Sequence, residues 1–236
     1  MKKTFNYGLW LGLFCWLLVA CGNNNSTTLD DTKQATDSID APQTAEALVL
    51  IQETDSDGNS LKYTQRDSDG IREGLFTKMN AAGVKIEETN YKNGRIDGQR
   101  ILYYPKGDTM IVESYHGDSF EGVYKSFYPN GKIKMQGVYH NNTMEGTWVQ
   151  YHENGQLKEE VLFSNNAENG PFKEYHPNGQ LSVVGTYKGG ANEEGTLKFY
   201  DEKGVHYKTM ECNKGVCRTT WAQEKPKGSK KKGKRS

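Results

Sequence analysis

Histidines are the first residues of this chain whose spacing suggests chemistry, and they are His116, His140, His152, His176 and His206. His152 and His176 occupy the same place in two similar segments, which raises a metal site. Such places lie two strands apart in a sheet of hairpins, about 9–10 Å, whereas a zinc ligand lies within about 2.1 Å of the metal. Since the same place holds Tyr104 and Tyr128 in other segments, we expect rings on a sheet face and no metal.

Motifs for catalysis are missing from the sequence. No Ser, Cys or carboxylate stands in a recognisable nucleophile motif, and no glycine pattern opens a helix for phosphate. The stretch from Glu53 to Gly58 resembles the start of a calcium loop, but its twelfth position is Thr64, not Glu. We therefore expect turns here and at 67–70, no cofactor and no enzymatic activity.

The N-terminus has the pattern of a secretory signal. Lys2 and Lys3 precede an apolar run, residues 7–20, that ends directly before Cys21. The run is short for a membrane span, which needs about 20 apolar residues. Three interpretations are open: an ordinary signal peptide, an uncleaved anchor with an incidental cysteine, and the lipoprotein signal described next.

The end of this run, Leu18-Val19-Ala20-Cys21, resembles the bacterial lipoprotein lipobox. The resemblance implies a signal peptide over 1–20, cleavage before Cys21 and acylation of that cysteine. Gly22, where an Asp would retain the protein at the inner membrane, implies the outer membrane of the cell envelope. The protein would then be lipid-anchored.

Two polar segments flank the central part of the chain. Residues 21–47 have no aromatic residue and few large apolar ones, which predicts a flexible tether. Residues 222–236 form a basic tail, a solubilising end or a contact with anionic lipid or cell-wall polymer. The formal net charge is zero, so no nucleic acid partner is expected.

Cys212 and Cys217 would lie in an exported compartment, where disulfides persist. Four residues separate them, enough to close a hairpin loop around Lys214-Gly215. Free thiols or a metal pair are the alternatives, although no second cysteine pair supports a metal. A disulfide would staple the C-terminal edge of a sheet.

An internal repeat organises residues 48–221. Its units start at the leading glycines Gly74, Gly98, Gly122, Gly146, Gly170 and Gly195. Each unit has two half-apolar runs around an Asn-Gly-type turn, a strong hairpin signal. Pro129-Asn130-Gly131 indicates a three-residue loop with a left-handed glycine. The pattern predicts an all-β fold, an elongated single antiparallel β-meander of repeated hairpins.

The loop register then assigns two faces to the sheet. In the unit from Gly146, the predicted core comprises Thr147, Val149, Tyr151, Leu157, Glu159, Val161 and Phe163. The opposite face, predicted to bind a partner, carries Tyr104, Tyr124, Tyr128, Trp148, His152, Phe172 and His176. A register error of one residue would exchange the faces.

The repeat resembles the bacterial variant of the MORN repeat, G-x-[FYW]-x-x-[YF]-x-x-N-G with a further ring near position seventeen. The resemblance covers about residues 48–212, although the first unit has Met79 and Ala82 in place of the ring and the Asn, and the last ends in Cys212. It implies a sheet bent into an open trough. Bacterial proteins of this pattern are often labelled YwqK-type antitoxins, which implies neutralisation of a toxin.

The expected function is a non-enzymatic, membrane-anchored scaffold that binds a protein or an envelope polymer. An antitoxin or immunity role, acting in the envelope, is the alternative that the resemblance implies. A purely structural role as a spacer also stays open.

Overall fold

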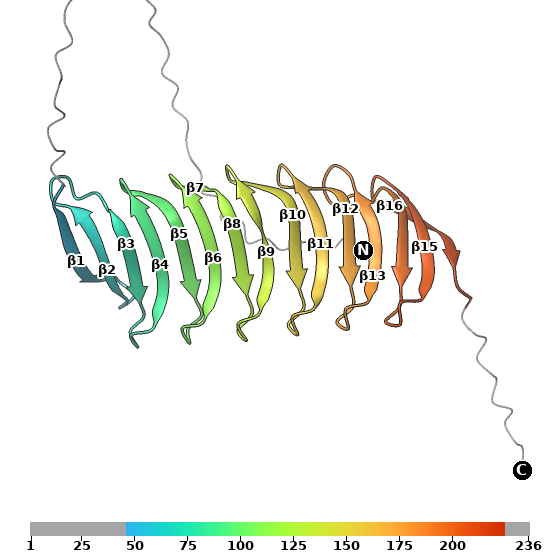
Figure 1. Ribbon diagram of the computed structural model, residues 1–236, viewed down its shortest axis with the longest axis horizontal. Helices are drawn as coiled ribbons and strands as arrows, with labels where there is room; N and C mark the ends of the chain where they lie inside the picture. Colours follow the sequence, from blue (N-terminus) through green and yellow to red (C-terminus); the bar gives the residue numbers. More distant parts are fainter. Residues whose placement is uncertain (1–45, 225–236) are drawn as a thin grey trace, which may run out of the picture. The chain divides into compact units, whose positions relative to one another are not determined.

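The computed structural model describes residues 46–224, which form one curved antiparallel sheet (Figure 1). The predicted signal peptide, Cys21, nearly all of the tether and most of the basic tail lie outside the described residues. Within 46–224 no helix is long and apolar enough to cross a membrane. The all-β prediction is confirmed, since every described element is a strand: β1 Leu48–Thr54, β2 Ser60–Arg66, β3 Gly74–Met79, β4 Lys85–Lys92, β5 Arg95–Tyr103, β6 Thr109–His116, β7 Ser119–Phe120, β8 Gly122–Phe127, β9 Ile133–His140, β10 Thr143–Tyr151, β11 Leu157–Ser164, β12 Ala167–Tyr175, β13 Leu181–Tyr187, β14 Gly195–Tyr200, β15 His206–Asn213 and β16 Val216–Ala222.

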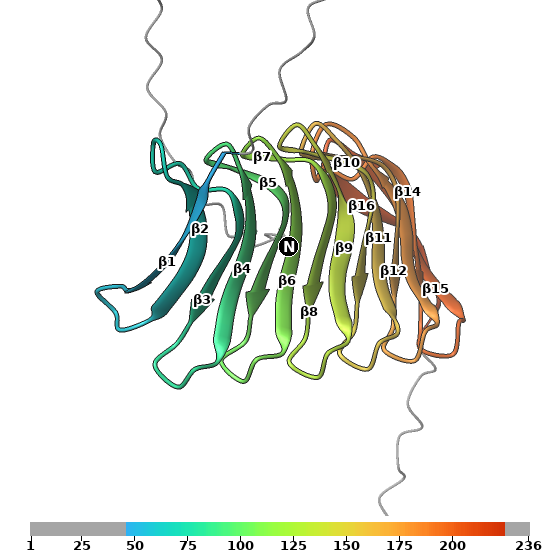
Figure 2. The ribbon, with the colours of Figure 1, turned by 60° about the vertical axis from the view of Figure 1, so that its left-hand side comes forward.

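The strands follow one another across the sheet in chain order, apart from the short β7, which pairs only with β6. Figure 2 shows that the strands bow along their length, so the meander is a curved ribbon with β1 and β16 at its two ends. Each unit therefore contacts only its neighbours, as in other repeat proteins.

At one end of the strands, three-residue loops join the two strands of each unit, as the sequence predicts. Tyr128 N–H donates to the Lys132 carbonyl over 2.8 Å, and Gly131 N–H donates to the Tyr128 carbonyl over 2.9 Å. Gly131 has a φ of 79°, which a glycine adopts at little steric cost. The Asn130 side chain accepts from Lys132 N–H over 3.0 Å, so the Asn-Gly pair fixes this loop by itself.

At the other end of the strands, most units are joined by two-residue turns. His140 pairs with Thr143, and the intervening Asn141 and Asn142 have φ values of 47° and 64°. Two residues with positive φ define a type I′ hairpin turn, whose twist matches that of the strands. Hairpin turns thus connect the strands at both of their ends.

A one-residue bulge follows each three-residue loop and corrects the predicted faces. Phe127 pairs with Ile133, but Ser126 pairs with Met135, so Lys134 has no residue opposite it. The same register shift occurs in all units that begin at the leading glycines. Because side chains alternate along a strand, one additional residue exchanges the faces of the first strand relative to the second.

The predicted core is therefore correct for the second strand and wrong for the first. Trp148 pairs with Val161, so the two side chains share a face, and Thr147 and Val149 point to the opposite one. We call the face that carries Trp148 the ring face. Its buried apolar side chains form the core: Phe76, Met144, Trp148, Val161, Phe163, Phe172, Leu197 and Cys212.

The leading glycines are required by backbone geometry. All of them have positive φ, between 72° at Gly146 and 129° at Gly170. A Cβ at Gly170 would also lie 2.6 Å from the Leu162 side chain. This is why the repeat retains a glycine inside a strand, where glycine otherwise destabilises.

Candidate interaction surface

The predicted binding face is not one exposed surface. Trp148 and Phe172, its two central rings, are each only 3% exposed. Trp148 packs against Tyr124 at 5.6 Å and Tyr139 at 5.1 Å between ring centroids. Phe172 stacks on Tyr187 at 4.2 Å. The bulge places these rings on the core side, so the prediction that they lie on an exposed face is wrong.

The indole of Trp148 rests on a strand position that has no side chain. A Cβ at Gly137 would lie 2.2 Å from an indole carbon. Gly185 has the same relation to Leu197, at 2.1 Å. The sheet thus stacks a large side chain on a glycine of the neighbouring strand, where any other residue would collide with it. Burial raises the pKa of the adjacent Tyr139 to about 12, which agrees with a core rather than a surface.

Tyr124 is thus a third predicted binding residue that packs in the core. The remaining four connect successive units at the three-residue loops and are Tyr104, Tyr128, His152 and His176. Tyr104 and Tyr128 hydroxyls donate to the carbonyls of Phe127 and Tyr151 over 2.7 and 2.8 Å. His152 and His176 Nε2–H groups donate to the carbonyls of Tyr175 and Tyr200, each over 2.9 Å. Tyrosine and histidine can replace one another at this position because both offer a ring with a polar hydrogen.

The Nε2 atoms of both histidines are therefore engaged in hydrogen bonds to backbone carbonyls. In the part of the chain that the structure describes, no group of three or more His, Cys, Asp or Glu residues could hold a metal ion. The loop asparagines add a second row of ties: Asn130, Asn154 and Asn178 donate to the carbonyls of Glu153, Pro177 and Glu202 over 3.0, 2.7 and 2.7 Å.

Carboxylates tie the units at the opposite end of the strands, a role that the repeat pattern did not predict. Glu121 accepts from Asn141 N–H over 2.8 Å, and Glu145 accepts from Asn165 N–H over 2.8 Å. The hydrogen bond from the Asn141 backbone, with a second from His140, lowers the pKa of Glu121. The signal was present in the sequence, since an acidic residue directly precedes most of the leading glycines.

One unit replaces the central ring by a cluster of charges. Arg100, at the place of Trp148, contacts Glu87 over 2.9 Å and Glu113 over 3.6 Å. Tyr115 donates a hydrogen bond to Glu113 over 3.1 Å. Burial raises the pKa of Glu113. The opposite charges are paired with one another within the ring face, as partly buried charges in proteins usually are.

The other side of the sheet carries inter-unit ties too, since the Asn90 side chain donates to the Gln99 carbonyl over 3.0 Å and the Ser114 hydroxyl donates to the Val123 carbonyl over 2.9 Å. We call this side the open face and define it by one row of cross-strand pairs: Leu75–Asn90, Gln99–Ser114, Val123–Val138, Thr147–Leu162, Pro171–Thr186 and Thr196–Glu211. Val123 and Val138 lie opposite one another and are each 46% exposed. Since larger exposed apolar patches mark interaction surfaces, this pair is the candidate point of contact on the open face.

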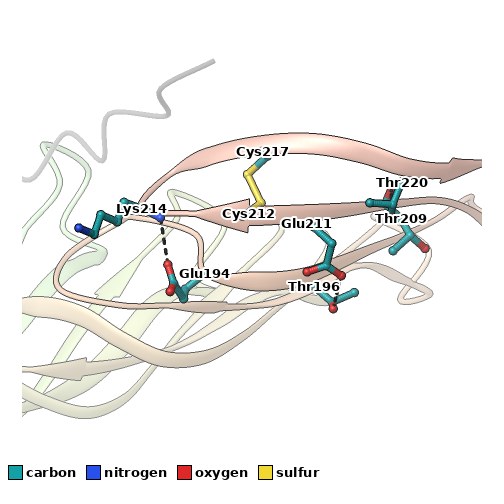
Figure 3. Close-up of a disulfide and its surroundings, with 8 residues drawn as sticks. All are labelled: Glu194, Thr196, Thr209, Glu211, Cys212, Lys214, Cys217 and Thr220. Atoms are coloured by element: carbon teal, nitrogen blue, oxygen red, sulfur yellow. Dashed lines mark hydrogen bonds between the residues drawn. A yellow bond between two sulfur atoms is a disulfide. The ribbon is translucent and has the colours of Figure 1, made fainter.

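The C-terminal end of the ribbon carries the predicted disulfide. Cys212 and Cys217 lie opposite one another on β15 and β16, with an S–S distance of 1.99 Å (Figure 3). Lys214 N–H, in the turn between them, donates to Glu194 over 2.9 Å. The bond joins the edge strand to its neighbour and agrees with the pairing favoured by the sequence.

These features define the class: a β-repeat protein whose hairpin units are tied to one another at both ends and which has one exposed face. Residues 120–141, 144–165 and 168–188 match the model of the MORN repeat variant. Each match begins two residues before a leading glycine, so sequence repeat and structural repeat are in phase. The chain thus contains MORN-variant repeats. No curated protein matches it.

Proposed function

We propose that this chain is a non-enzymatic repeat scaffold that binds a partner protein through its open face. The observation that carries the proposal is the pair Val123 and Val138, which are apolar, opposite one another and half exposed in the middle of the ribbon. An envelope polymer is the other ligand class, and the experiment below distinguishes it.

The rest of the sheet suits a scaffold. The ladders of hydrogen bonds at both ends hold each unit in fixed register with the next, so the open face is presented without a second layer to order it. A surface that is organised before binding loses less conformational entropy on binding.

The scaffold would be held on a membrane by an acylated Cys21, with residues 1–20 removed and the outer membrane as the destination. This part of the proposal rests on the lipobox pattern of the sequence. A membrane fraction that loses the protein on Cys21→Ser supports it. Retention of the Cys21→Ser chain in that fraction contradicts it.

Photo-crosslinking in living cells tests the binding surface. A photoreactive residue replaces Val123 or Val138 on the open face, and in a matched control it replaces Val216, which is exposed on β16. We expect a discrete adduct from the first two sites only, which mass spectrometry identifies as a protein or as a glycan-bearing polymer. Adducts only from Val216, or none from the open face, contradict the proposal.

The antitoxin alternative comes from the resemblance of the repeats alone. It predicts a toxic gene next to this one, whose killing is relieved by co-expression of the chain. Val138→Lys should abolish that relief if the open face is the site, and a neighbouring gene without toxicity would remove the alternative.

A further inference from the structure

The N-terminal edge of the ribbon lacks the features that usually protect an edge strand. β1 has the sequence LVLIQET, with no lysine or proline, and it pairs with β2 without a register shift. Leu48 and Leu50 are 52% and 53% exposed. Among residues 46–224 no strand lies beyond it. A regular, apolar, exposed edge is a template for adding another strand.

The hydrogen bonds to β2 show which backbone groups face outward. The Ala47 carbonyl accepts from Asp67 N–H, and Asp55 N–H donates to the Asn59 carbonyl, each over 2.9 Å. Odd-numbered residues of β1 therefore bond to β2. Since the bonding direction alternates along an antiparallel strand, the N–H and C=O groups of Leu48, Leu50, Gln52 and Thr54 point to the open edge.

The topology restricts which strand of a second copy could fill this edge. All neighbouring strands are antiparallel, and an even number of steps separates β1 from β16, so these two edges run in the same direction. Joining β16 to β1 of the next copy in line would therefore give a parallel pair. If the ring faces of both copies lie on the same side, an antiparallel pair forms only between two copies of the same edge strand, either β1 with β1 or β16 with β16. The two copies are then related by a two-fold axis normal to the sheet.

Of the two edge strands, β1 is better suited to pair with its own copy. β16 pairs with a register shift at Thr209 and Met210 and carries Arg218, and its other central residues are threonines. In β1 the apolar residues are consecutive, from Leu48 to Ile51, so a two-fold axis close to Leu50 sets apolar side chains against one another. The acidic residues Glu46 and Glu53 lie on either side of this segment and would not face their own copies.

We propose that two copies of this chain associate through antiparallel pairing of their β1 strands, which forms one continuous two-fold symmetric sheet. The interface is isologous and closes, so it gives a dimer and not a filament. One pair of edge strands is a small interface, of the class below about 1,200 Å² that typifies transient complexes. Association should accordingly depend on protein concentration.

Cysteine crosslinking of the full chain in cells tests the geometry. Residues opposite one another on antiparallel strands lie about 4.5–5.5 Å apart between Cα atoms, within the range of about 4.4–6.8 Å for a disulfide. Val49→Cys, Leu50→Cys and Ile51→Cys are compared with Val216→Cys, in a chain whose Cys15 and Cys21 are replaced by serine. We expect a disulfide-linked dimer on a non-reducing gel with at least one β1 variant, and little with Val216→Cys.

A second measurement separates loss of pairing from loss of folding. Gln52→Pro removes an outward-facing N–H but no hydrogen bond to β2, so the purified variant should keep its melting temperature while dimerising about tenfold more weakly by light scattering. Crosslinking only through Val216→Cys, no crosslinked dimer from any site, or unchanged association of a folded Gln52→Pro variant would overturn the proposal.

Discussion

Replacing Trp148 by alanine tests the assignment of the ring face most directly. A buried aromatic side chain removes about 150–250 Å² from water, which at about 25 cal/mol per Å² amounts to about 4–6 kcal/mol as an upper bound. Measured Phe or Trp to Ala changes in cores cost about 3–5 kcal/mol. Trp148 is 3% exposed and contacts three further rings, Tyr124, Tyr139 and Phe163, so we expect a loss of about 4 kcal/mol in the free energy of unfolding.

Two matched variants make this measurement specific. Trp148→Phe keeps a ring and removes the indole N–H, which is buried without a hydrogen-bond partner. A buried polar group without a partner costs about 1–3 kcal/mol, so removing it should offset much of the lost ring area. Val123→Ala, on the open face, should change stability by less than about 1 kcal/mol because its side chain is half exposed.

The assay is urea unfolding followed by circular dichroism, with intrinsic fluorescence as a second probe. Because units contact only their neighbours, a defect at Trp148 should also separate the unfolding of the two halves of the ribbon and broaden the transition. If Trp148→Ala cost less than about 1 kcal/mol while Val123→Ala cost more, the ring face would not be the core and the reasoning from the bulge would fail.

Three further predictions concern the ties and the edge. His152→Phe should lose about 1 kcal/mol of stability by thermal unfolding, because the Tyr175 carbonyl loses its donor, whereas His152→Tyr should retain it; equal losses would refute the tie. The pKa of Glu121 is lowered in the folded state, so the stabilisation from its ionised form is complete above the ordinary pKa of 4.5 and disappears as the pH falls through the lower folded pKa. The melting temperatures of wild type and Glu121→Gln should therefore differ at pH 7 and converge in acid. A difference that persists in acid would count against this. Replacing both Cys212 and Cys217 by serine should cost roughly 2 kcal/mol through loop entropy, measured against the intact disulfide, and an unchanged midpoint would show that the bond does not restrain the unfolded chain.

The sequence by itself determined the architecture. The spacing of the leading glycines and the Asn-Gly corners is a local signal, since a left-handed glycine and an asparagine that bonds to its own turn need no distant partner. The hairpin order, the three-residue loop at 129–131 and the pairing of Cys212 with Cys217 could therefore all be derived from residues close together in the chain.

Only the tertiary structure decided which face is the core. The bulge opposite Ser126 and Phe127 leaves no distinct residue in the sequence, because Lys134 and its equivalents are ordinary strand residues. Its effect is large, since one additional residue exchanges every side chain of the preceding strand between the faces. That is why the rings of Trp148 and Phe172, which a regular strand would expose, became the centre of the core.

The structure also decided the roles of the polar residues. His152 and Glu121 bond to atoms that are 23 and 20 residues further along the chain, and these distances become contacts only when one unit lies beside the next. The exposure of Val123, Val138 and the β1 edge likewise depends on there being one sheet layer over residues 46–224. A repeat fixes what each unit looks like, whereas the packing of unit on unit fixes which of its side chains remain available to a partner.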